Sequence, residues 1–260
     1  MTATPADIDP TSESNDPERE LQKMSFLEHL EELRKRLLYS IMAIFVGFLA
    51  CWWKAEAIYE WLQAPLTRFL PANDNKLAFT HLTAPFFLYM KVAFFAGIFL
   101  VSPFILLQVW QFISPGLYKR ERRYAAPFII FATLFFVAGG YFGYRFILPA
   151  TCSFFMETGK HFKQVVTIEE YFSFANTIIL AAGLVFETPI LIFFLARLGI
   201  VTPAFLLQKS KYAIVGSFII AAIVTPTPDM VTQSALALPM IALYFLGIGV
   251  AFLFGKRHEA

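Results

Sequence analysis

The sequence predicts an all-α, polytopic membrane protein with six transmembrane helices. Hydrophobic residues make up 58% of the 260-residue chain and charged residues only 15%, which leaves too little polar surface for a soluble domain of this size. The apolar residues, which include 31 Phe, are gathered in continuous runs long enough to cross a bilayer. These runs do not alternate at a period of two, so the pattern disfavours a β-barrel.

Residues 25–36 are expected to form an amphipathic helix on the membrane surface that leads into the first span. Ser25 and Glu28 have the spacing of a capping box, which predicts a helix start. Four apolar residues fall on one helical face: Phe26, Leu30, Leu33 and Leu37. The alternative is an ordinary solvated helix, in which the pairs Glu31–Lys35 and Glu32–Arg36 each contribute roughly 0.2–0.5 kcal/mol.

Six spans follow one another with polar or proline-containing loops between them. They are expected at about residues 37–53, 85–112, 125–148, 172–198, 212–224 and 230–254. The fifth would be only about 20 Å long against a hydrocarbon core of about 30 Å, which implies a thinned bilayer or a protein-lined cavity. Ile58, Trp61 and Leu62 indicate a short interfacial helix, and Gly139, Gly140 and Gly143 indicate close helix packing.

The distribution of basic residues predicts the orientation of the chain. Of the 21 Lys and Arg residues, 14 lie in residues 1–36, 113–124, 197–211 and 255–260. Basic loops stay in the cytoplasm, so both termini are expected there. Residues 1–23 are acidic and lack aromatic residues, which is typical of a disordered tail. The expected organisation is therefore this tail, a membrane domain over residues 24–254 and a short second tail over 255–260.

Glu187 is the acidic residue that the membrane tolerates least, because carboxylates inside spans are rare and usually face a cavity or a partner. One interpretation is a polar site in a concave surface. The other is a neutral structural carboxyl group, hydrogen-bonded and paired with Lys91. Pro189 lacks an N–H, so the carbonyl of Val185 loses its usual donor, and a kink or a bound water is expected there.

Two further polar groups are candidates for binding. Glu121 is a lone acid in a basic loop, where it either balances charge or receives a cation at the membrane face. Thr225, Asp229 and Gln233 cluster at the turn between the last two spans. Asp229 has the position of a helix cap, while Thr225 and Gln233 have hydroxyl and amide groups for a partner span.

The sequence carries no catalytic motif and no metal-ligand spacing. The four His are scattered, and two Cys do not define a disulfide framework. No phosphate-binding loop, nucleophile elbow or paired intramembrane Asp is present. We therefore expect neither an enzyme nor a bound cofactor, metal or nucleic acid.

Six separated stretches resemble the TatC family of twin-arginine translocase subunits, in the family's order and over about residues 24–254. They are FLEHLEELRKR at 26–36, APL at 64–66, Pro103 with QVWQFI at 108–113, PGLYKRERR at 115–123, FETP at 186–189 and TPTPDMVTQ at 225–233. The resemblance implies a receptor for twin-arginine signal peptides of folded proteins. It also implies an oligomer with the single-span partners TatB and TatA in the bacterial inner membrane, driven by the proton-motive force.

The resemblance also assigns roles to residues. Glu32 and Glu121 match the signal-binding carboxylates, and Arg34 and Phe112 are expected at the same signal-peptide site, where Phe112 matches a structural position of the family. Glu187 matches the intramembrane acid, Asp229 the exoplasmic acid, and Thr225 with Gln233 the partner-facing polar cluster. Pro65 and Pro103 match structural positions. The family's cupped bundle, with short fifth and sixth spans, is likewise implied.

The chemistry of arginine agrees with this assignment, because a carboxylate offers each guanidinium a planar, bidentate acceptor. A secondary transporter with Glu187 as its proton or ion site is the alternative, although we find no inverted repeat of the kind that many transporters carry. A purely structural scaffold is a third possibility, in which Glu32 and Glu121 would be freely replaceable.

Overall fold

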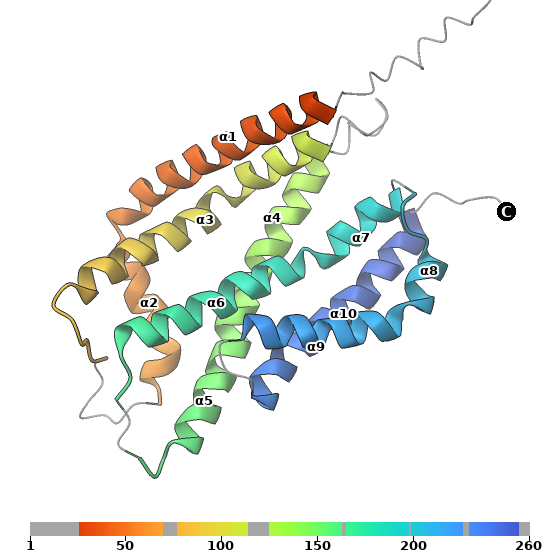
Figure 1. Cartoon of the computed structure of the whole chain (residues 1–260). Helices are drawn as coiled ribbons and strands as arrows, with labels where there is room; N and C mark the ends of the chain where they lie inside the picture. Colours follow the sequence, from red (N-terminus) through yellow and green to blue (C-terminus); the bar gives the residue numbers. More distant parts are fainter. Residues whose placement is uncertain are drawn as a thin grey trace, which may run out of the picture.

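The computed structural model describes residues 26–69, 77–113, 125–162, 165–197, 199–225 and 229–254. Over these residues the chain is helical, apart from connecting turns and one isolated parallel bridge between Ala78 and Thr167 (Figure 1). The helix start expected at Ser25, the two tails and Glu121 lie outside the described residues.

In the described part of the chain, five helical stretches are long and apolar enough to cross a membrane, and α9 is a shorter sixth. This confirms the expected all-α, multi-pass class. The elements are α1 Phe26–Trp52, α2 Ala55–Thr67, α3 Ala84–Ile113, α4 Ala125–Phe142, the π-helical η3 Gly143–Ile147, α5 Leu148–Thr158, α6 Ile168–Phe186, α7 Thr188–Arg197, α8 Pro203–Gln208, α9 Ser210–Val224 and α10 Met230–Phe254.

The third and fourth spans differ from their sequence expectations. The third was expected to end at Leu148, but α4, η3 and α5 continue to Thr158. Pro149 has no N–H for the carbonyl of Arg145, and the helix widens into the π-helical turn there instead of ending. The fourth span is divided at Glu187 into α6 and α7, which is the break expected next to Pro189.

The last two spans differ from each other in length. α9 has 15 residues, about 22 Å of helix, so the expectation of a short fifth span is confirmed. α10 has 25 residues, so the expectation of a short sixth span is wrong. No charged residue interrupts it, and Pro239 is accommodated inside the helix.

Small residues let pairs of helices approach closely. A Cβ atom added at Gly139 would lie 2.5 Å from the carbonyl oxygen of Ala182 in α6, and one added at Gly143 would lie 2.9 Å from the Ala182 Cβ. The close packing expected at these glycines is therefore confirmed. The antiparallel pair α1 and α3 (Figure 1) meets in the same way at Gly47 and Gly97, where an added Cβ on Gly97 would lie 2.7 Å from the backbone nitrogen of Phe48.

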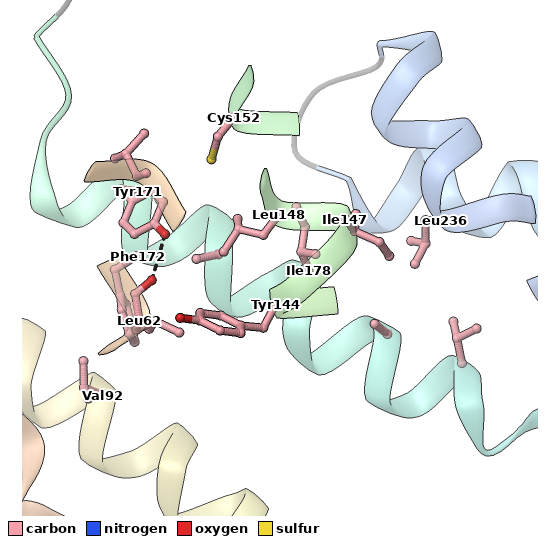
Figure 2. Packing of buried hydrophobic residues seen from close by; sticks show 14 of the residues in the cluster. Leu62, Val92, Tyr144, Ile147, Leu148, Cys152, Tyr171, Phe172, Ile178 and Leu236 are labelled. Carbon is pink, nitrogen blue, oxygen red and sulfur yellow. Dashed lines mark hydrogen bonds between the residues drawn. The ribbon is translucent and has the colours of Figure 1, made fainter. Parts of the chain in front are cut away.

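Two tyrosine hydroxyls attach α2 to the main buried cluster. Tyr171 of α6 donates to the Leu62 carbonyl at 2.8 Å, and Tyr144 of η3 donates to the Trp61 carbonyl at 2.7 Å. Figure 2 shows the Tyr171 bond and the packing around it, with Phe172 beside Leu62. The interfacial helix expected around Trp61 is confirmed as α2, and side chains far along the chain hold it in place.

Hydroxyl groups donate to carbonyls that prolines leave without their usual intrahelical donor. Pro65, Pro103 and Pro189 each lack the N–H that would bond the carbonyl four residues earlier. Those carbonyls accept instead from side chains, with distances of 2.7, 2.8 and 2.6 Å. The pairs are Tyr144 with Trp61, Ser102 with Phe99, and Thr188 with Val185.

Candidate functional site

A polar cluster joins the first turns of α1 to the last turns of α3. Arg36 donates from Nε to Glu32 Oε1 at 2.6 Å, and its Nη2 lies 2.5 Å from the same oxygen. Nη1 of Arg36 donates to Gln108 Oε1 at 3.3 Å and to Gln111 Oε1. The guanidinium therefore connects a carboxylate on its own helix with two amides on a neighbouring helix.

Aromatic stacking supports the cluster from the side. The His29 ring of α1 stacks on Phe112 of α3 with 4.4 Å between centroids and 21° between planes.

Of the two ion pairs considered for α1, only that of Glu32 with Arg36 forms. Over the described residues Glu31 and Lys35 are exposed and make no ion pair.

The structure thus brings two of the four expected signal-site residues, Glu32 and Phe112, to the same pair of helix ends. Arg34 is exposed beside them, and Glu121 lies outside the described residues. Sequence reasoning missed Gln108 and Gln111 as site residues. Gln108 could have been found from the sequence as an amide side chain within an apolar span. In the structure Gln108 is only 4% exposed.

Glu187 lies at the break between α6 and α7 with one carboxyl oxygen unsatisfied. Its Oε1 is buried and has no hydrogen-bond partner among the described residues. The pairing with Lys91 considered from the sequence does not form among the described residues. Lys91 lies in the first turns of α3, whereas Glu187 follows the last residue of α6. A buried oxygen without a hydrogen bond is energetically costly, so we expect water or another donor to bind it.

The turn between α9 and α10 uses its polar groups within the chain. Asp229 Oδ1 accepts from the backbone N–H of Thr232 at 2.7 Å, so its expected role as a helix cap is confirmed. Thr225 is buried and donates to the Ala221 carbonyl at 2.8 Å. Gln233 Nε2 donates to the Phe218 carbonyl at 2.9 Å, which links α10 to α9.

These features define a multi-pass helical membrane protein. Its polar groups lie where the start of α1 meets the end of α3, at the break between α6 and α7, and at the turn between α9 and α10. Within the described residues, no group of three or more His, Cys, Asp or Glu could hold a metal ion. The chain belongs to the TatC family: residues 28–239 match the family model described as Sec-independent protein translocase protein (TatC).

Individual relatives agree with this assignment. The chain is 48% identical over 260 residues to the Sec-independent protein translocase protein TatC of Koribacter versatilis, covering 97% of this chain and 96% of the relative. It is 40% identical to TatC of Escherichia coli strain K12, covering 85% and 86%. A crystal structure of the twin arginine translocase receptor TatC superposes with a TM-score of 0.76 at 34% identity, covering 87% of this chain and 99% of that one.

Membership in this family confirms the resemblance stated from the sequence and identifies the chain as a component of Sec-independent protein translocation. Its relatives are named as translocase proteins, which is a transport role and not a catalytic one. Translocation involves other components of the same system, so the chain works within a complex.

Proposed function

We propose that this chain is the receptor and core subunit of the twin-arginine translocase. It binds the twin-arginine signal peptides of folded proteins at Glu32 and Glu121, beside Arg34 and Phe112. With TatB and TatA it exports those proteins across the bacterial inner membrane at the expense of the proton-motive force, with both of its own termini in the cytoplasm.

The observation that carries this proposal is the geometry of Glu32. Both bonds from Arg36 end on Oε1 of this carboxylate. The Oε2 atom accepts no hydrogen bond within the described residues and would accept an arginine of a signal peptide, next to a guanidinium that already fixes the orientation of the carboxylate. A second carboxylate at Glu121 would serve the second arginine of the pair.

The partner helices are proposed to dock at the turn that holds Thr225 and Gln233. This turn lies beside the short α9, where polar groups come close to the hydrocarbon and an unmatched one is costly. Gln233 already holds α10 to α9, so it would position the docking surface as well as contact a partner. Family membership favours this translocase over a secondary transporter with Glu187 as its ion site.

The proposal is tested by photo-crosslinking a twin-arginine peptide to the chain in membranes. Glu32→Ala and Glu121→Ala should each lower the crosslinking yield severalfold, and a Lys-Lys peptide should bind less well than an Arg-Arg peptide of equal charge. Glu31→Ala is the matched control, since Glu31 is the exposed neighbour of Glu32 without an ion pair among the described residues. Equal yields from all variants would refute the receptor role.

A further inference from the structure

Lys91 is an exposed cation inside a membrane-spanning helix. It lies near the start of the span Ala84–Ile113 and makes no ion pair within the described part of the chain. A charge at this depth is costly, and lysine side chains extend toward the nearer interface to reduce that cost. Trp52, whose ring meets Phe86 edge-on at 5.9 Å, marks that interface. The ammonium group therefore needs an anion at the level of Trp52.

A cavity of about 300 Å³ lies beside Lys91 and also contains a carboxylate. Its lining includes Lys91 and Phe87 of α3, Glu169 and Phe172 of α6, and His81 of the preceding loop. Lys91 and Glu169 line the same space without forming an ion pair. Two opposite charges that share a cavity but do not pair leave room between them for a ligand that carries both signs.

Backbone hydrogen bonds join the segment before the cavity residue His81 to the segment before Glu169. Ala78 donates from its backbone N–H to the Val166 carbonyl at 3.0 Å, and Ile168 donates to the Ala78 carbonyl at 2.9 Å. The Thr80 hydroxyl lies 3.5 Å from Glu169 Oε2, to which it donates. The Thr80 hydroxyl therefore contacts the carboxylate, and the backbone bonds of Ala78 hold the segment that carries Thr80 against the start of α6.

An apolar groove between α1 and α3 begins at the same lysine. Its volume is about 510 Å³, and Lys91 belongs to its lining as well as to that of the polar cavity. The other lining residues are all apolar: Ile41, Ile44, Phe45 and Phe48 of α1, with Met90 and Phe94 of α3. Lys91 thus joins a polar cavity at the membrane interface to a groove of hydrocarbon character that lies deeper in the bilayer.

We infer that these two spaces form a binding site for one molecule of phosphatidylethanolamine from the leaflet on the side of Trp52. The lipid phosphate binds the ammonium group of Lys91, the lipid ammonium group binds Glu169, and one acyl chain occupies the α1–α3 groove. A phosphate alone would satisfy Lys91 but would meet the carboxylate of Glu169 as a like charge. A headgroup with both charges matches the pair, and a primary ammonium group also donates hydrogen bonds to a carboxylate.

The site is tested with the purified full chain in detergent by native mass spectrometry. The probes are phosphatidylethanolamine and phosphatidylglycerol with identical acyl chains, at equal concentration. The wild-type chain should retain one phosphatidylethanolamine in preference to phosphatidylglycerol. Lys91→Gln should weaken this retention about tenfold, the size of one lost charge-assisted hydrogen bond, while Lys91→Arg should preserve it. Glu169→Gln should abolish the preference between the two lipids.

Lys54→Gln provides the matched control, because Lys54 is an exposed lysine directly before α2 that lines neither space. It should retain the lipid as the wild type does. Glycerophosphoethanolamine and inorganic phosphate, which lack acyl chains, should not displace the lipid at matched concentration.

The inference is overturned if the wild type retains no lipid, if Lys91→Gln retains as much as Lys54→Gln, or if either water-soluble competitor displaces the lipid. Retention of both lipids equally would refute the role of Glu169. If Lys91 instead serves an acidic residue of a partner helix, the partner-free chain will retain no lipid, which is the first of these outcomes.

Discussion

The Tyr144 hydroxyl donates a 2.7 Å hydrogen bond to the carbonyl of Trp61, the carbonyl that Pro65 leaves without an intrahelical donor. The same two residues stack their rings with 3.8 Å between centroids. A proline within α2 is therefore compensated by a tyrosine from the π-helical turn of the third span. This relationship fixes the short helix α2 against the membrane bundle.

Tyr144→Phe should lower the stability of the chain by about 1 kcal/mol, because the carbonyl of Trp61 loses its donor. In a Pro65→Ala background the backbone N–H of residue 65 becomes available, so the same change should cost much less. The measurement is the thermal midpoint of the four proteins in detergent, compared as a double-mutant cycle. Tyr141→Phe is the control, since Tyr141 is 57% exposed. Additive effects in the cycle would contradict the compensation.

Thr188→Val should destabilise the break between α6 and α7, because the Thr188 hydroxyl donates to the Val185 carbonyl, which Pro189 leaves without its usual backbone donor. The substitution keeps the shape of the side chain, and a loss of about 1 kcal/mol is expected. Thr177→Val is matched to it, since Thr177 bonds the carbonyl of Ser173 in α6, where no proline removes a donor. Equal thermal midpoints for the two variants would show that the hydroxyl of Thr188 has no special role.

Gly139→Ala should weaken the packing of α4 against α6 by about 1–3 kcal/mol, because the new methyl group would lie 2.5 Å from a backbone oxygen. Gly249→Ala is the control within another span, where an added Cβ has no atom within 4 Å. Alanine also favours a helix over glycine, so the control should be neutral or slightly stabilising. Thermal unfolding in detergent measures both, and a Gly139→Ala midpoint at or above that of the control would refute the close contact.

Water should reach Glu187, because its buried oxygen lacks a partner in the described chain and lipid offers none. In a background without Cys51 and Cys152, a Glu187→Cys variant should react with a water-soluble maleimide. Leu184→Cys and Leu191→Cys should stay unlabelled, since these leucines, 61% and 60% exposed in the bundle, face lipid. A Glu187→Cys thiol as unreactive as these controls would indicate a dry, structural carboxyl group.

Replacement of Glu187 separates hydrogen bonding from charge. Glu187→Gln keeps a group that accepts and donates hydrogen bonds, whereas Glu187→Leu removes both. If hydrogen bonding at the α6–α7 break is what matters, export of a twin-arginine reporter should be closer to wild type for Gln than for Leu. Equal loss of export in both variants would show that the carboxyl group itself is required.

Local patterns in the sequence were sufficient for much of the architecture. Long apolar runs gave the number and order of the spans, and the short run after Lys211 gave the short fifth span, because hydropathy over one helix length is a local property. The Glu32–Arg36 pair followed from its spacing of four residues. Ser102 and Thr188, each directly before a proline, are also visible in the sequence, and each hydroxyl bonds a carbonyl only three residues earlier.

Only the tertiary structure decided which residues meet across helices. Arg36 reaches Gln108 and Gln111 more than seventy positions away, and Lys91 shares a cavity with Glu169 and not with Glu187. The compensation of Pro65 by Tyr144 spans a similar distance along the chain. In a membrane protein the faces toward lipid and toward other helices are both apolar, so hydrophobic periodicity does not fix the rotation of a span. That rotation, set by glycine contacts and aromatic packing, determines which polar side chains share a site.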